Sequence, residues 1–226
     1  MRKIISYKFN HLITLTSLFL LFFSINLMAQ PVKSTVETSN QAWKYGIRAG
    51  ANYDGTNIRQ GSEYKIGWKA GFVAEKRLVY NMYFQPSISF LNKGYQSEMP
   101  FSQRDDINAY LIEGVAGMLM KFGDERAGRG LIISIAPYFT YGIGGNSIFE
   151  DLRDPLDTNY FGKVTEKTFS DNRLNAFDIG FQLGLGYDIN HRWELGGVYI
   201  FGLNKMRNNS NALWTGFQVH LSYFFY

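Results

Sequence analysis

The chain has 226 residues, enough for one or two domains, and it contains no cysteine, so disulfides and a lipoprotein anchor are excluded. Its 23 basic and 19 acidic residues give a net charge of +4, but three of the basic residues lie in the first 29. The rest of the chain carries about +1, so the basic character does not indicate nucleic-acid binding.

Residues 1–29 have the layout of a secretory signal peptide. Arg2, Lys3 and Lys8 form a positive region before the apolar run "LITLTSLFLLFFSINLMA", which ends at Ala29. A membrane-spanning helix needs roughly 20 strongly apolar residues, whereas this run is shorter and includes Thr, Ser and Asn. We expect a cleaved signal peptide at 1–29, a flexible periplasmic tail at 30–42 and a folded domain at 43–226.

Beyond the tail, apolar and polar residues alternate with the period of β-strands. In "WKYGIRAGANY" the odd positions carry Trp43, Tyr45 and Ile47, and the even positions are polar or glycine. Pro86 and Pro137 lie inside two such segments and predict bulges, because proline cannot donate to a ladder. Eight strands are predicted, at 43–53, 65–75, 82–90, 108–122, 131–142, 177–189, 193–204 and 213–225.

The apolar face of these strands contains no Lys, Arg, Asp or Glu. Lys or Arg on a lipid-facing surface would cost about 2–4 kcal/mol at the bilayer midplane. The second face is mostly Gly, Ser, Gln and Asn, unlike the densely charged outer face of a soluble sandwich. We therefore predict an all-β fold, an eight-stranded antiparallel transmembrane up-and-down β-barrel integral to the cell outer membrane, in contact with outer-membrane lipid.

The stretch "FDIGFQLGLGYDI" (177–189) resembles a glycine-rich phosphate loop, but its alternation runs unbroken through the glycines. A dinucleotide fingerprint needs a strand, a tight turn and then a helix. Gly180, Gly184 and Gly186 are instead expected to face a narrow lumen. No cofactor or nucleic-acid partner is predicted.

An eight-stranded barrel has an interior just wide enough for side chains, so the lumen is predicted to be plugged. Buried charges must be paired. Alternation also turns Lys65, Lys121, Asp188 and Glu194 toward the lumen. The predicted structural ion-pair network consists of Lys44, Arg48, Lys69, Glu75, Glu113 and Asp178.

Two other groups of residues bear on function. His220 and Ser222 share the lumen face of the last strand, but a nucleophile also needs an orienting acid and substrate access, so no catalytic residue is assigned. No metal site is predicted either, because the two mature histidines are distant and acids in the loop 146–172 match no calcium-loop spacing. That loop also has apolar residues that predict a partner surface or a short added hairpin. These candidate partner residues are Phe149, Leu152, Tyr160 and Phe161.

Four segments carry a resemblance to a known family: "LNKGYQ" (91–96), "IAPYFTYGIGG" (135–145), "FDIGFQLGLGYDI" (177–189) and "YIFGLNK" (199–205). From about Trp43 onward the chain resembles the PorT-like outer-membrane β-barrel family of Gram-negative bacteria. The resemblance implies an eight-stranded, porin-like barrel without catalytic residues, and some relatives are linked to type IX protein secretion.

Three functions follow as expectations. The first is a non-enzymatic scaffold or accessory subunit working with outer-membrane or periplasmic secretion proteins. The alternative is a surface binding or adhesion barrel that acts through its extracellular loops. The third is a lipid-modifying enzyme.

Overall fold

The computed structural model describes residues 42–57, 62–99, 103–124, 128–151, 162–169, 174–207 and 211–225. The predicted signal peptide and all but the last residue of the predicted tail lie outside these ranges. No helix in the described part of the chain is long and apolar enough to cross a membrane.

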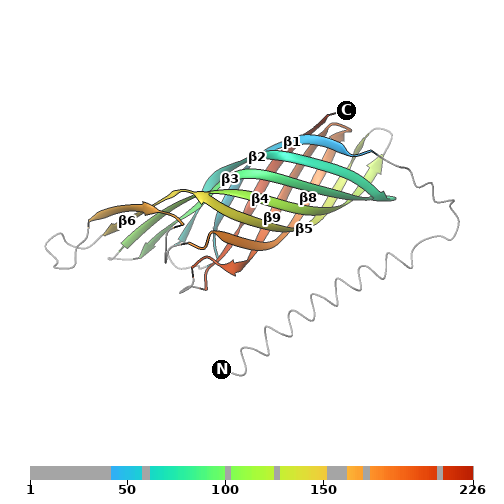
Figure 1. The fold of residues 1–226 in the computed structure, drawn as a ribbon. Helices are drawn as coiled ribbons and strands as arrows, with labels where there is room; N and C mark the ends of the chain where they lie inside the picture. The colour runs from blue at the N-terminus through green and yellow to red at the C-terminus, as the bar shows by residue number, and fades with distance from the viewer. Residues whose placement is uncertain are drawn as a thin grey trace, which may run out of the picture. The chain divides into compact units, whose positions relative to one another are not determined.

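The described residues form ten strands in one antiparallel sheet (Figure 1). All eight predicted strands are present, most of them longer than predicted. They are β1 (Lys44–Thr56), β2 (Ser62–Val79), β3 (Met82–Met99), β4 (Gln103–Asp124), β5 (Arg129–Gly144), β8 (Phe177–Asn190), β9 (Trp193–Lys205) and β10 (Leu213–Phe225). The two others, β6 (Asn146–Asp151) and β7 (Lys163–Lys167), form the added hairpin that was one expectation for this loop.

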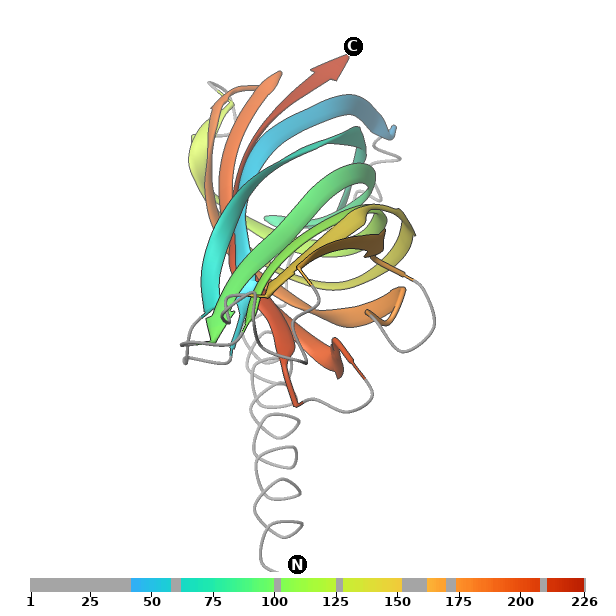
Figure 2. The same cartoon turned by 90° about the vertical axis from the view of Figure 1, so that its left-hand side faces the viewer.

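Eight of the strands close into a ring, which Figure 2 views from the side that carries β6. The sheet order runs β3-β2-β1-β10-β9-β8-β5-β4, and β3 also pairs with β4. Closure pairs the backbone groups along both sides of every barrel strand, as a hydrocarbon environment requires. The predicted eight-stranded up-and-down barrel is confirmed.

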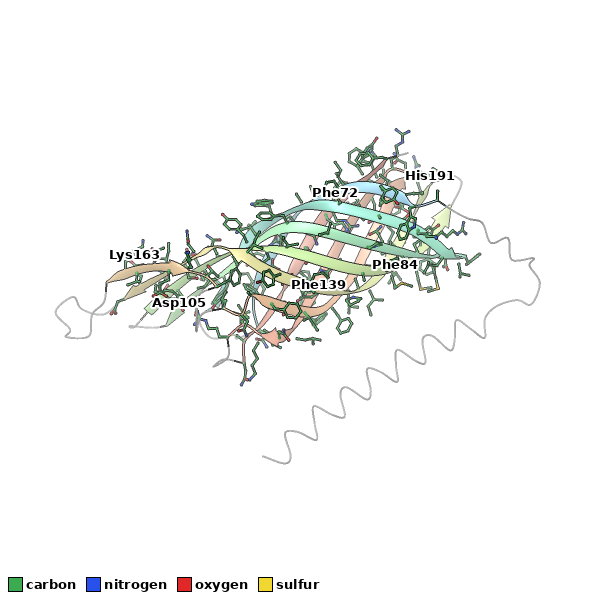
Figure 3. The ribbon with its side chains drawn as sticks, viewed as in Figure 1. Phe72, Phe84, Asp105, Phe139, Lys163 and His191 are labelled. Atoms are coloured by element: carbon green, nitrogen blue, oxygen red, sulfur yellow. The ribbon has the colours of Figure 1, made fainter. Side chains whose placement is uncertain are left out.

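The outer face of the ring is an apolar belt. Phe72, Phe84 and Phe139 project outward from the barrel in Figure 3, and Phe72 is 68% exposed. Aromatic pairs lie toward both ends of the belt. They are Trp193–Tyr223 and Trp43–Phe84 near the start of β1 and the end of β10, and Trp68–Phe90 and Phe90–Tyr110 near the other end. This is the arrangement of a lipid-facing band between two aromatic girdles.

The bulges predicted at the two prolines are wrong. Pro86 lies opposite Ala116, and Pro137 lies opposite Phe181, in registers that pass both prolines without a shift. In an antiparallel sheet the N–H and C=O groups of a residue bond to only one of the two neighbouring strands. A proline, which has no N–H, therefore removes at most one hydrogen bond of the ladder. The shifts in the β2–β3 pair fall elsewhere, between Tyr64 and Lys69 and between Arg77 and Val79.

A small sheet extends beyond the barrel at the end opposite the start of β1 and the end of β10 (Figure 1). It is built on β4, whose 22 residues pair first with β6 and then with β5. Between β5 and β6 the chain passes through Gly145, whose φ of +136° is a conformation that other residues rarely adopt. We call this sheet the extension. It comprises residues 62–64, 95–99, 103–107, 146–151 and 163–167.

Substituting Gly145 by Ala is expected to destabilise the extension. A Cβ at this position would meet the Asn108 carbonyl oxygen at 2.2 Å in addition to the strained φ. Strain of this kind costs on the order of 1–3 kcal/mol. Hydrogen exchange of the β6 amides should speed up in Gly145→Ala and stay unchanged in the neighbouring control Gly144→Ala, where a Cβ would meet nothing within 4 Å. Equal exchange in both variants would contradict this reading of the bend.

Candidate functional site

The lower lumen, toward the start of β1 and the end of β10, is filled by a network of ion pairs. Arg48 contacts Glu194 at 3.1 Å and donates to Ser222 Oγ at 2.8 Å. Lys121 Nζ lies 2.7 Å from Glu75 and 3.0 Å from Asp188. Gln85 links the carboxylates, because its amide donates to Glu75 at 3.0 Å and to Glu194 at 2.8 Å.

The middle of the lumen is crossed by one buried ion pair. Lys69 Nζ contacts Glu113 and also donates to Gln218 Oε1 at 2.9 Å. Gln182 donates to the second Glu113 oxygen at 3.2 Å. The Lys69 side chain is 3% exposed and that of Glu113 is fully buried. A pair so enclosed needs its remaining lone pairs satisfied, and the two glutamines do this.

The upper lumen has a buried lysine that the sequence analysis missed. Lys93 is 1% exposed, and its Nζ has no hydrogen-bond partner among the described residues. It lies 5.0 Å from the Trp214 ring centroid and 5.7 Å from that of Tyr138, within cation–π range. The Tyr138 hydroxyl in turn donates to Asp178 at 2.8 Å. Alternation along β3 would have placed Lys93 in the lumen, but the strand was predicted to end at residue 90.

The predicted network residues are therefore distributed over three levels. Arg48 and Glu75 lie in the lower level, Lys69 and Glu113 form the middle pair, and Asp178 lies in the upper level. Lys44 is opposite Glu75 in the β1–β2 register, but the Glu75 carboxylate is bound by Lys121 and Gln85.

Lys65 does not face the lumen as alternation predicted. It pairs with Asp106 at 2.5 Å, and the two side chains are 21% and 31% exposed. A register shift of the β2–β3 pair falls beside this residue, between Tyr64 and Lys69, whereas the β1–β2 register runs through Lys65 without a shift.

His220 and Ser222 are both buried, and neither has room for a substrate. Ser222 Oγ accepts a hydrogen bond from Arg48, and His220 Nε2 lies 3.9 Å from Glu194. The cavity that His220 lines beside Arg48 has a volume of about 30 Å³, which suits water rather than a lipid. Within the described residues no group of three or more His, Asp or Glu side chains is placed to hold a metal ion.

An apolar cluster closes the lumen where the barrel meets the extension. In it Tyr95 and Trp214 make an edge-to-face contact with ring centroids 6.0 Å apart. Burial raises the pKa of the Tyr95 hydroxyl above its ordinary value, which keeps this hydroxyl neutral. We call this cluster the cap. It consists of Tyr95, Ile107, Phe149, Leu174, Met206, Ala212 and Trp214.

Phe149 therefore differs from its predicted role as an exposed partner residue. It is 3% exposed and packs in the cap, because β6 turns this side chain inward, opposite Asp105 in the β4 register. The other three candidate partner residues, Leu152, Tyr160 and Phe161, lie outside the described residues.

A closed antiparallel ring with an apolar belt, two aromatic girdles and a filled polar lumen defines an integral outer-membrane β-barrel protein. Sequence comparison agrees with this class. The chain belongs to the family described as outer membrane protein beta-barrel domain, whose model matches residues 28–208. No curated protein sequence matches the chain closely enough to count as a relative.

Solved structures with similar chains are small outer-membrane barrels of low sequence identity. The attachment invasion locus protein Ail of Yersinia pestis is 10% identical with a TM-score of 0.45, covering 82% of this chain and 100% of its own. Neisserial surface protein A is 10% identical with a TM-score of 0.43 and the same coverage. The N-terminal β-barrel domain of Pseudomonas aeruginosa OprF is 8% identical with a TM-score of 0.32, covering 79% of this chain and 97% of its own.

Replacing Lys69 by Met is expected to destabilise the barrel strongly, because Glu113 would be left charged and buried without its partner. Breaking a buried ion pair in this way costs about 3–5 kcal/mol. The folded barrel is recognised on a gel by a band that shifts on boiling. The measurement is the urea concentration at which half of this band is lost for the barrel in lipid vesicles. The double variant Lys69→Met/Glu113→Leu should recover much of the loss. If the single variant matched the intact chain, the pair would not contribute to stability.

The filled lumen is expected to block diffusion of small solutes. Vesicles containing the intact barrel should not swell in a sugar solution, whereas vesicles containing a general porin should. Swelling at the rate of the porin control would show that the cap and the ion pairs open in the membrane.

Proposed function

We propose that this outer-membrane barrel is non-enzymatic and acts as a surface binding protein through its extracellular end. The observation that carries this proposal is the extension, because it is the part of the fold that spanning the membrane does not require. With both chain ends in the periplasm, the usual orientation of such barrels, the extension lies outside the cell. The filled lumen and the 30 Å³ cavity leave little scope for transport or lipid chemistry.

The extracellular loop between β6 and β7 is the proposed contact site. In the sequence that joins β6 to β7 there are three apolar residues, Leu152, Tyr160 and Phe161. Apolar side chains clustered on an outer loop are typical of partner surfaces.

A second candidate is the accessory role in protein secretion that a PorT-like assignment implies. One observation favours it. The β2–β3 hairpin ends at the periplasmic side in Leu78, Val79 and Tyr80, which are 49%, 58% and 78% exposed. Tyr80 also has a φ of +43°, which is unusual for an aromatic residue. An exposed apolar tip of this kind suits a periplasmic partner.

Two matched triple variants separate these functions. One changes Leu152, Tyr160 and Phe161 to Ser at the outer end, and the other changes Leu78, Val79 and Tyr80 to Ser at the inner end. In a deletion strain complemented with each chain, retention of cells on wells coated with mucin, fibronectin or heparin should fall with the outer variant alone. Surface labelling checks that both variants are inserted in the outer membrane. The shift of the gel band on boiling checks that both are folded.

If the inner variant lost exported proteins while attachment was unchanged in both variants, the secretion role would be supported instead of surface binding. Unchanged attachment and export in the deletion strain itself would contradict both candidates.

A further inference from the structure

The outer face of the extension has a row of alternating charges that runs across four neighbouring strands. Glu98 of β3 pairs in register with Arg104 of β4, Arg104 with Glu150 of β6, and Glu150 with Lys163 of β7. Arg104 lies 2.9 Å from Glu98 and 3.8 Å from Glu150. We call this row the charge ladder. Figure 3 shows Lys163 at the end of the molecule remote from His191.

Stability alone does not account for the charge ladder. The side chains of Arg104, Glu98 and Glu150 are 49%, 55% and 41% exposed, and ion pairs in such positions are screened and contribute little. The sheet below it is already held by the cap on its inner face. The ladder also borders a groove of about 590 Å³, lined by Glu63, Gln96, Asp106, Ile148 and further polar residues.

This charged face is continuous with the lipid-facing belt. Side chains two residues apart on a strand share a face, so along β4 the same face carries Ile112, Tyr110, Asn108, Asp106 and Arg104 in succession. Ile112 and Tyr110 belong to the apolar belt and are 39% and 42% exposed. Arg104 is six residues beyond Tyr110, about 20 Å along the strand and about 15 Å above the girdle at the usual tilt.

We infer that the outer face of the extension docks against the phosphorylated saccharide headgroups of the outer-leaflet glycolipid. The belt fixes the membrane level, and the ladder stands at the height that these headgroups occupy above it. A headgroup layer in which phosphates alternate with divalent cations presents both signs of charge, and so does the ladder. Arg104 and Lys163 contact phosphate oxygens, and Glu98 and Glu150 face the cations.

A protein partner fits this face less well. Cores of protein interfaces are depleted in charged residues, whereas Ile148 is the one apolar residue among the described residues that line the groove. The inference goes beyond the proposed surface binding and is independent of it. It concerns the outer face of the extension, whereas the proposed surface binding concerns the sequence between β6 and β7.

Binding of a soluble probe tests the inference. Deacylated lipopolysaccharide, which has the headgroup without the acyl chains, is titrated into the folded barrel in detergent with Mg²⁺. The intact chain should bind it, and Arg104→Gln/Lys163→Gln should bind at least about tenfold more weakly, a loss of about 1.4 kcal/mol. The matched control Lys205→Gln/Arg129→Gln removes two exposed charges away from this face and should bind as the intact chain does.

A second measurement uses the intact chain, so that its result does not depend on whether a variant folds. Hydrogen exchange of the β6 and β7 amides should slow when the probe and Mg²⁺ are added, and EDTA should reverse the protection. Equal affinity of the ladder variant and the control, or no protection of β6 and β7 in the intact chain, would overturn the inference. Attachment of cells through the loop at 152–161 could survive that result.

Discussion

Lipid offers the peptide backbone no hydrogen-bond partners, and the rest of this structure depends on that constraint. A chain that crosses the membrane as strands must pair every strand on both sides, so the sheet closes between β3 and β4. Eight strands give a lumen too narrow for a pore. Once the ring is this small, the interior must be filled, and a side chain filling it must find its polar partners inside.

The glycines of β8 show how tight that interior is. A Cβ on Gly180 would meet the Phe201 carbonyl oxygen at 2.0 Å, and one on Gly184 would meet Ser134 Oγ at 2.4 Å. These positions belong to the stretch that resembles a phosphate loop, and their physical role is to let larger side chains such as Tyr138 fill the lumen. Side-chain amides also take part in the packed lumen as hydrogen-bond donors. Gln85 donates to Glu194 and Gln182 donates to Glu113, so these amides add hydrogen bonds to carboxylates that are also paired with cations.

Most of the fold could be predicted from the sequence because alternation is a strong signal over ten residues or more. The strand ends could not be predicted. Many residues at 94–99 and 103–106 are polar and look like parts of a loop, but β3 and β4 continue through them as the extension. The site was predicted less completely. Lys121 and Glu194 were placed in the lumen by alternation, yet their mutual contacts depend on strand register, which one chain's pattern does not give. Phe149 was predicted to be a partner residue, but it is buried in the cap. The sequence of a long loop does not show whether an apolar side chain points inward or outward.

The unbroken course of β4 has a mechanical consequence. A single strand of 22 residues joins the tip of the extension to the periplasmic rim of the barrel, and it is paired with β5 for much of that length. A tensile force applied to the tip would therefore run along the strand axis and load the lateral hydrogen bonds to β5 together, in shear, rather than opening them one at a time. The strand arrangement is thus suited to resist a pulling force applied at the extension.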